Sequence, residues 1–272
     1  MPRRSRNWLQ RLLKGKEDLP ASSPEDASRS FTAIGPYYDV LMSNVPYRSW
    51  VDYVRRVLDR FEARPETVLD LACGTGMVGA EIARRDCPHV FGVDLSEGMA
   101  RVAAEEGRLR VAVQDARALG LKPESFDLVV CLYDSLNYIL EPEGLAAFFR
   151  GVGDCLKPGG LFIFDLNTVR ALALDLFTKD NLRSPDPLTY SWRSDWDGAS
   201  RLCTVRMWFR WSDGGETREF VEVHRQRGYA DDEVQDLLRE AGLDILAVYD
   251  AYSFERLHSR STRAFYIARR AT

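Results

Sequence analysis

Short apolar runs alternate with longer amphipathic stretches through the first part of the chain. In the amphipathic stretches Ser96 stands where a helix N-cap is expected, and Pro142 stands at the first turn of another helix. Several runs are apolar on both faces, which is typical of parallel strands covered by helices on both sides. The pattern predicts an α/β, doubly wound fold, with a turn at 157–160 before the last run. The predicted strands span 68–71, 90–93, 110–113, 126–132 and 161–164.

The periodicity changes further along the chain. Segments 190–196, 202–211 and 217–227 each alternate with period two, and Asp197-Gly198 and 213–215 separate them as hairpin turns. The pattern predicts an antiparallel three-stranded β-sheet inserted at about 186–228. A helix from Asp231 to 241–242 and strands at 243–249 and 263–268 follow. In the middle segment of the insert, alternation places these side chains on one face: Cys203, Val205, Met207, Phe209 and Trp211.

Composition narrows the class of protein. The 272 residues are 45% hydrophobic and 29% charged, which excludes a wholly disordered chain or a fibre. No apolar run is long enough for a membrane span, and a net charge of −4 makes nucleic acid an improbable partner. The five cysteines lack a C-x-x-C pair, so we expect no metal site, no disulfide framework and a cytoplasmic location.

The first thirty residues differ from the rest. Residues 1–16 carry six Arg and Lys and no acid, and 19–24 are rich in Pro and Ser. We predict a basic, flexible N-terminal tail over 1–30. The alternative is a short amphipathic helix that contacts anionic lipid or a partner. The remainder, 31–272, is predicted to be one domain that carries the inserted sheet.

A glycine-rich loop follows the first strand. Gly74-Thr75-Gly76-Met77-Val78-Gly79 has the G-x-G-x-x-G pattern, in which glycines allow a tight turn and free amides attract negative charge. Asp94 closes the next strand, where a carboxylate can accept hydrogen bonds from a ribose diol. The same pattern suits an NAD-linked oxidoreductase, although no paired Tyr and Lys proton relay is visible.

Further residues extend this pattern. Asp70 lies in the first strand, Asp115 ends the third, and Lys157-Pro158-Gly159-Gly160 precedes the fifth. With 68–76 and Asp94 they resemble the class I S-adenosylmethionine-dependent methyltransferases, over about 31–270. The resemblance implies a Rossmann-like, seven-stranded sheet with an antiparallel last strand, and S-adenosylmethionine as cofactor. Ala72 replaces the family's usual glycine.

The resemblance also assigns cofactor contacts. The methionine part would lie over residues 72–76, the ribose on Asp94, and the adenine between Leu95 or Met99 and Ala116, with Asp115 at its edge. Asp70 would steady the loop. The aromatic N-terminal element around Tyr38 looks like that of glycine and amino-sugar N-methyltransferases and would cover the cofactor. The full implied set is Tyr38, Trp50, Asp70, Ala72, Cys73, Gly74, Thr75, Gly76, Asp94, Leu95, Met99, Gln114, Asp115, Ala116, Leu132 and Ser135.

The segment after the fourth strand, 132–138, is the expected acceptor site, because ligands bind beyond the carboxyl ends of the strands. It lacks the Asn/Asp-Pro-Pro-aromatic string of nucleic-acid and glutamine N-methyltransferases. Candidate catalytic residues are Asp134, Tyr133 and His224, which shares a strand face with Phe220 and Glu222. The alternative for His224 is a solvent-facing position among 225–227. Candidate substrate-binding residues are Asn137, Tyr138 and Tyr47.

These observations predict a methyltransferase that uses S-adenosylmethionine and acts on nitrogen or oxygen of a small-molecule acceptor. Two alternatives stay open. One is an RNA or protein methyltransferase that docks through the basic tail. The other is a non-catalytic module that binds the cofactor. A homodimer is an open alternative to a monomer.

Overall fold

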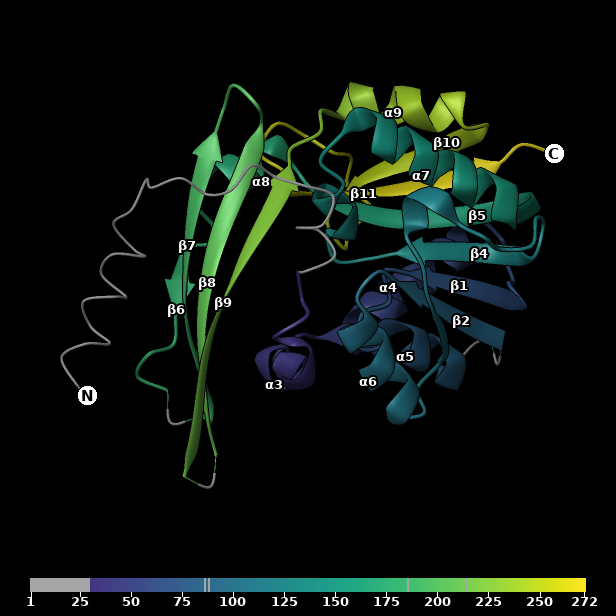
Figure 1. Ribbon diagram of the computed structural model, residues 1–272. Helices are drawn as coiled ribbons and strands as arrows, with labels where there is room; N and C mark the ends of the chain where they lie inside the picture. The colour runs from purple at the N-terminus through teal and green to yellow at the C-terminus, as the bar shows by residue number, and fades with distance from the viewer. Residues whose placement is uncertain (1–29, 86, 88, 185, 214) are drawn as a thin grey trace.

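The structure is a computed structural model that describes residues 30–85, 87, 89–184, 186–213 and 215–272, so the predicted tail lies outside it except for Ser30. A large helix-flanked sheet and a smaller sheet stand side by side (Figure 1). Among the described residues, no helix has the length and apolar character needed to cross a bilayer.

The large sheet has seven strands in the order β10-β11-β5-β4-β1-β2-β3. Five strands pair in parallel, while β11 runs antiparallel to both β5 and β10. The doubly wound sheet and its antiparallel last strand are therefore confirmed. The bounds are β1 Thr67–Leu71, β2 His89–Asp94, β3 Arg110–Val113, β4 Phe126–Cys131, β5 Leu156–Asn167, β10 Leu243–Asp250 and β11 Arg263–Arg270.

Helices cover both faces of this sheet. In β1, Val68 packs in the core shared with α4 and α5, while Leu69 and Leu71 pack with α7 and α9 on the opposite face. Ser96 caps α6, because its Oγ accepts the Met99 N–H. The helices are η1 Gly35–Tyr37, α3 Tyr38–Leu41, α4 Tyr47–Arg60, α5 Met77–Arg85, α6 Glu97–Glu105, η2 Ala116–Ala118, η3 Ser135–Tyr138, α7 Pro142–Cys155, α8 Val169–Ala173 and α9 Asp231–Glu240.

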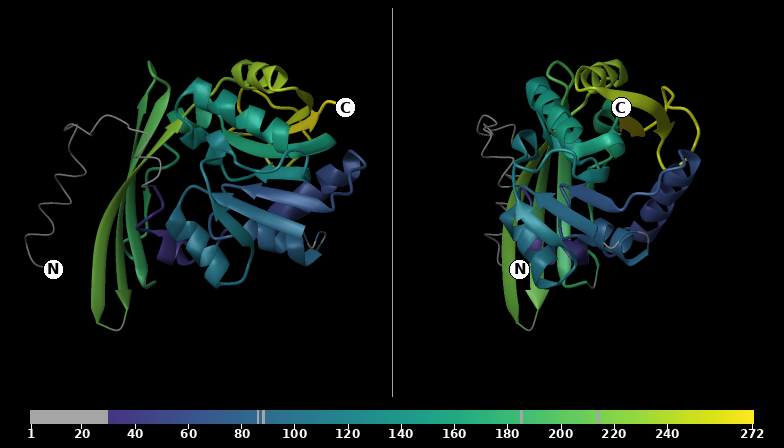
Figure 2. Two further views of the ribbon diagram at one scale, coloured as in Figure 1. Left: turned by 45° about the vertical axis from the view of Figure 1, so that its right-hand side comes forward. Right: turned by 90° about the vertical axis from the view of Figure 1, so that its right-hand side faces the viewer.

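The smaller sheet, here called the roof sheet, is antiparallel in the order β6-β7-β8-β9. The prediction that Cys203, Val205, Met207, Phe209 and Trp211 share a face is confirmed. The first four are buried in one cluster with Ile34 and Met99, and Trp211 packs against that cluster, so this is the inward face. Two further views show the roof sheet extending past the helices beside it (Figure 2). Its bounds are β6 Lys179–Asp180, β7 Leu188–Asp197, β8 Leu202–Asp213 and β9 Glu216–Arg227.

Two predictions about these sheets were wrong in detail. The roof sheet has a fourth strand, β6, which is only two residues long and carries no periodic signal. The predicted turn at 157–160 lies within β5 as an irregular stretch, because Leu156 pairs with Phe126 while Leu161 pairs with Leu128. Gly159, with a φ of 77°, accommodates the extra residues.

Candidate functional site

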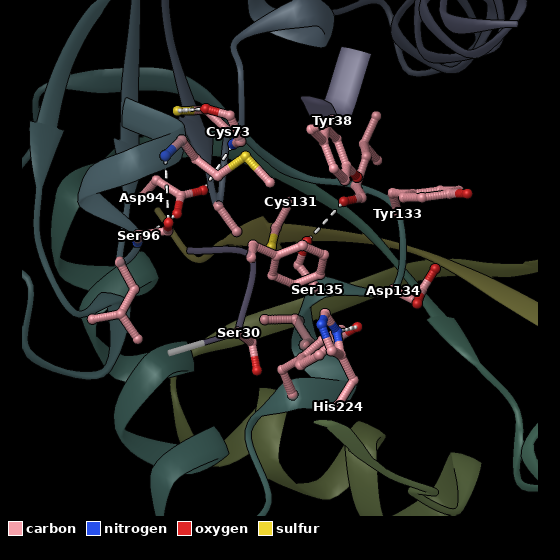
Figure 3. Close-up of a pocket in the computed structure, with 18 of the residues that line it drawn as sticks. Ser30, Tyr38, Cys73, Asp94, Ser96, Cys131, Tyr133, Asp134, Ser135 and His224 are labelled. Atoms are coloured by element: carbon pink, nitrogen blue, oxygen red, sulfur yellow. Dashed lines mark hydrogen bonds between the residues drawn. The ribbon is translucent and has the colours of Figure 1, made fainter. Parts of the chain in front are cut away.

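A cavity of about 290 Å³ lies between the carboxyl ends of β1, β2 and β4 and the inner face of the roof sheet. Residues 30–42, here called the strap, close one side of it. In Figure 3 Asp94 and Ser96 lie on one side of the cavity, with Tyr38, Tyr133 and Asp134 on the other. The predicted residues that line it are Tyr38, Tyr47, Trp50, Asp70, Ala72, Cys73, Gly74, Thr75, Asp94, Leu95, Met99, Gln114, Asp115, Ala116, Leu132, Tyr133, Asp134, Ser135, Tyr138 and His224.

Two predicted residues lie elsewhere. Gly76 is buried within the loop, with a φ of 83°. Asn137 is fully buried, and its Nδ2 donates to the carbonyls of Asn167 (3.1 Å) and Arg227 (2.8 Å) while its Oδ1 accepts the Asn167 N–H (2.9 Å). With its amide committed to the backbone, Asn137 ties the roof sheet to β5 and does not reach the cavity.

The glycine-rich loop owes its course to left-handed backbone. Ala72 and Gly74 have φ values of 54° and 56°. Ala72 therefore occupies a conformation that favours glycine, which is the residue the resemblance leads one to expect there. At the other end of the loop, a Cβ on Gly79 would lie 2.6 Å from Leu109 Cδ1 and 2.9 Å from Asp70 Oδ2. A larger residue would force the Leu109 and Asp70 side chains to move, so glycine is favoured where α5 approaches the sheet.

Asp94 braces the loop and still faces the cavity. Its Oδ2 accepts the Gly74 N–H at 2.7 Å and its Oδ1 accepts the Ser96 N–H at 2.8 Å. A carboxylate has about four lone-pair sites, so each oxygen retains capacity for a ligand hydroxyl. Leu95 and Ala116 add apolar surface nearby. These residues fit the adenosyl group that the resemblance implies, because the Asp94 carboxylate could accept hydrogen bonds from a ribose diol and the apolar surface could contact an adenine.

Asp70 lies beneath the same loop. It is 2% exposed and accepts the Gly79 N–H at 3.0 Å. Burial raises its pKa to about 7, and the nearby Asp94 charge adds to the effect. A positively charged ligand group in the cavity would stabilise its ionised form. Asp115 differs, because the Arg117 guanidinium donates to both of its oxygens, and these hydrogen bonds lower its pKa.

The strap is attached at both ends. Glu222 on β9 accepts the backbone N–H groups of Phe31 (3.1 Å), Ala33 (2.9 Å) and Ile34 (3.1 Å). Farther along, Asp39 accepts the Thr75 hydroxyl at 2.6 Å and pairs with Arg108 at 2.7 Å. The strap thus connects the roof sheet to the glycine-rich loop across the cavity.

Aromatic rings surround the cavity beside the strap. The Trp50 ring lies 4.8 Å from that of Tyr133 and 5.3 Å from that of Tyr47. Burial raises the pKa of the Tyr133 hydroxyl to about 12. Such rings attract a cation over their faces, so this wall suits a sulfonium.

The turn after β4 is held by an ionic cluster that sequence reasoning missed. Tyr133 and Asp134 have φ values of 68° and 51°, which are strained for residues with side chains. Asp165 accepts both of their backbone N–H groups, at 2.6 and 3.1 Å. Arg263 pairs with Asp165 and, at 2.8 Å, with Asp134. Burial raises the pKa of Asp134, and the Arg263 charge opposes that rise.

His224 points into the cavity, so the solvent-facing alternative is wrong. It is 1% exposed and contacts Tyr138 and Glu222. Neighbouring Gln226 is also buried, and its Nε2 donates to Asp134 Oδ2 at 2.8 Å. Strand alternation could have identified Gln226, since it shares a face with His224. No local signal pointed to Arg263, which reaches the cavity from β11.

Comparisons with known proteins agree with this geometry. Residues 68–160 match the family described as "Methyltransferase domain". The chain is 30% identical over 243 residues to the Bacillus subtilis protein named "Putative methyltransferase YqeM", covering 86% of this chain and 94% of that protein. A crystal structure of a S-adenosylmethionine-dependent methyltransferase from Clostridium acetobutylicum is 29% identical, with a TM-score of 0.78 over 89% of this chain and 99% of that one. The sugar N-methyltransferase KedS8 from Streptoalloteichus shares the fold, with 22% identity and a TM-score of 0.74 over 95% of this chain and 100% of that one.

Proposed function

The chain belongs to the class I S-adenosylmethionine-dependent methyltransferases, and from that premise we propose that it methylates a nitrogen or oxygen atom of a small-molecule acceptor. The observation that carries the proposal is the closure of the cavity. The roof sheet and the strap cover the carboxyl ends of the strands, and the room beneath them is about 290 Å³. The cofactor would fill much of that space, so the room that remains suits a small acceptor.

The cofactor, when bound, supplies a methyl group on a sulfonium. We assign its ribose to Asp94 and its adenine to the apolar surface of Leu95 and Ala116. Asp70 would stabilise the charge of its methionine amine. The Tyr38 and Trp50 rings, which both line the cavity, would exclude water and face the sulfonium.

The acceptor would occupy the part of the cavity under the roof sheet. Trp192, Met207 and Phe209 supply apolar contact there, while Asp134 supplies a buried carboxylate. Asp134 binds Arg263 and Gln226 with one oxygen each, so lone pairs remain for an N–H or O–H of the acceptor. Because a carboxylate accepts hydrogen bonds from N–H and O–H groups, Asp134 favours an acceptor that is methylated on nitrogen or oxygen over one methylated on carbon. The fold shared with a sugar N-methyltransferase is consistent with this assignment.

The alternative of a macromolecular substrate gains no support from the described residues. A macromolecule would have to present its base or side chain to a cavity that the strap and the roof sheet partly cover. The basic tail that such a substrate would use lies outside the described residues.

Two experiments test the proposal. Calorimetry should detect binding of S-adenosylmethionine and of its demethylated product, and no binding of NAD. Purified enzyme supplied with S-adenosylmethionine carrying a labelled methyl group should then label a compound in fractionated metabolite extracts, on nitrogen or oxygen by mass spectrometry. Label that enters only RNA, only protein, or only a carbon atom would overturn the assignment of the acceptor.

A further inference from the structure

We propose that Tyr138, His224 and Glu222 form a proton relay that receives the acceptor's proton during methyl transfer. The inference rests on the proposed function, because it concerns the N–H or O–H of the acceptor. It assigns the reacting proton to a chain of three side chains under the roof sheet, with Tyr138 as the catalytic residue and His224 and Glu222 as positioning residues.

The three side chains form a continuous hydrogen-bonded line. Tyr138 Oη lies 2.9 Å from His224 Nδ1, and His224 Nε2 lies 2.8 Å from Glu222 Oε2. Tyr138, at the end of η3, is half-buried and lines the cavity, whereas His224 and Glu222 on β9 are 1% and 6% exposed. The line therefore leads from the cavity into the roof sheet and away from solvent.

Glu222 determines which nitrogen of the His224 imidazole carries the proton. Its carboxylate also accepts three backbone N–H groups of the strap, from Phe31, Ala33 and Ile34. Four donors fill the acceptor sites of an ionised carboxylate, which has no proton to give. The hydrogen bond to His224 must then come from Nε2–H. In the neutral imidazole Nδ1 is left as the acceptor, and the Tyr138 hydroxyl donates to it.

The relay is shielded from water. The Phe31 ring packs edge-on against the His224 ring at 4.6 Å and lies 5.3 Å from the Tyr138 ring. Other ionisable groups whose charges act on Tyr138 are Asp134, Tyr133 and Tyr38. Burial raises the pKa of Tyr138 well above its ordinary value, and the neighbouring carboxylates add to this. A free phenolate is therefore unavailable at neutral pH, and Tyr138 can take a proton only while giving one away.

The proton transfer balances without a further reactant. As the acceptor's nitrogen or oxygen bonds the methyl carbon, the carbon–sulfur bond breaks and its electron pair stays on sulfur. The acceptor's proton passes to Tyr138 Oη while the Tyr138 proton passes to His224 Nδ1. The resulting imidazolium is paired with the Glu222 carboxylate. Glu222 thus serves both the relay and the strap, whose backbone N–H groups it accepts.

The first test is the tautomer of His224, which needs no acceptor. The chain has three histidines, so ¹⁵N-labelled imidazoles can be assigned with His224→Asn. Spectra at pH 7–8, with and without S-adenosylmethionine, should show Nε2–H and an unprotonated Nδ1. Tyr138→Phe should shift the Nδ1 resonance, which also identifies it if His224→Asn does not fold. A Nδ1–H tautomer, or an imidazolium at every pH, overturns the relay.

The second test is kinetic and uses the acceptor found by the screen. Tyr138→Phe should lower kcat by about 100-fold, as expected for loss of general-base help. Its rate should rise with pH as the acceptor loses its proton to solvent. Cofactor affinity should stay within twofold. Tyr190→Phe is the control, since that hydroxyl lies on the roof sheet outside the cavity, and its kcat should be unchanged.

The outcomes separate the two proposals. Wild-type kcat for Tyr138→Phe across pH 6–9 would overturn the relay and leave the proposed acceptor class intact. A macromolecular acceptor that is methylated on nitrogen or oxygen, and whose methylation falls in Tyr138→Phe, would overturn the proposed function and support the relay. If no acceptor is found, the tautomer of His224 decides.

Discussion

Replacing Arg263 by Met tests whether the ionic cluster of Asp134, Asp165 and Arg263 stabilises the turn after β4, which borders the acceptor part of the cavity. Arg263 is the cation that lies between two buried carboxylates, Asp134 and Asp165, and its guanidinium also lies 5.4 Å from the Tyr133 ring centroid. Met has similar length and no charge, so the variant removes the pairing and preserves most of the packing. Removing one partner of a buried ion pair costs about 3–5 kcal/mol.

The loss should also depend on pH. Burial already raises the pKa of Asp134, and the variant removes the charge that opposes that rise. The native variant then binds more protons than the unfolded chain, so its stability falls as pH increases. Relative to wild type, Arg263→Met should be least stable at pH 8 and should recover toward pH 5.

Urea unfolding at pH 5, 6.5 and 8 measures both effects. Arg260→Met, at an exposed position, is the matched control and should change the unfolding free energy by less than about 0.5 kcal/mol. Arg263→Met combined with Asp134→Asn should recover part of the loss, since one orphaned charge is removed. If Arg263→Met does not fold, Arg263→Lys should show a smaller loss with the same pH trend. A loss below about 1 kcal/mol that does not vary with pH would refute the reasoning.

Three further predictions concern the cofactor half. Asp94→Ala should weaken binding of S-adenosylmethionine by about 1–3 kcal/mol in calorimetry, and unchanged affinity would contradict the ribose assignment. Asp70→Asn should make the folded chain about 1–3 kcal/mol more stable at pH 8 and leave its stability little changed at pH 4. The reason is that ionising a carboxyl whose pKa is raised to about 7 in the folded state destabilises the wild-type protein as pH rises from 4 to 7. Equal urea midpoints for variant and wild type at pH 8 would contradict this. Ala72→Gly relieves a left-handed alanine at an entropic cost in the unfolded chain, so it should stabilise by about 0–1 kcal/mol and retain cofactor affinity; clear destabilisation would show that φ of 54° is not strained here.

The sequence predicts the cofactor half well because its residues are close together along the chain. The loop at 72–79 and Asp94 lie at the ends of adjacent parallel strands, and parallel strands bring their carboxyl ends to one edge. Strand alternation likewise predicts the inward face of β8. The pattern does not predict β6, because two residues cannot show a period.

The acceptor half is less predictable because it is assembled from distant segments. Asp134 and Arg263 meet only because β11 inserts antiparallel beside β5, which carries Asp165. That pairing depends on register, which short apolar runs do not determine. Asn137 is predicted to bind the substrate because it follows β4. Its side-chain amide is instead hydrogen-bonded to backbone groups of β5 and β9.

The strap connects the cofactor part of the cavity to the part under the roof sheet. One end binds Glu222, which also holds His224, and the other end binds Thr75 of the glycine-rich loop through Asp39. A change in the loop that displaces Asp39 therefore alters the position of the strap, and with it the cover over Tyr138 and His224. The strap is also held by packing, because Ile34 is buried in the apolar cluster of the roof sheet, so displacing the strap would disturb that cluster. The strap therefore gives the glycine-rich loop and the side chains under the roof sheet a shared structural support.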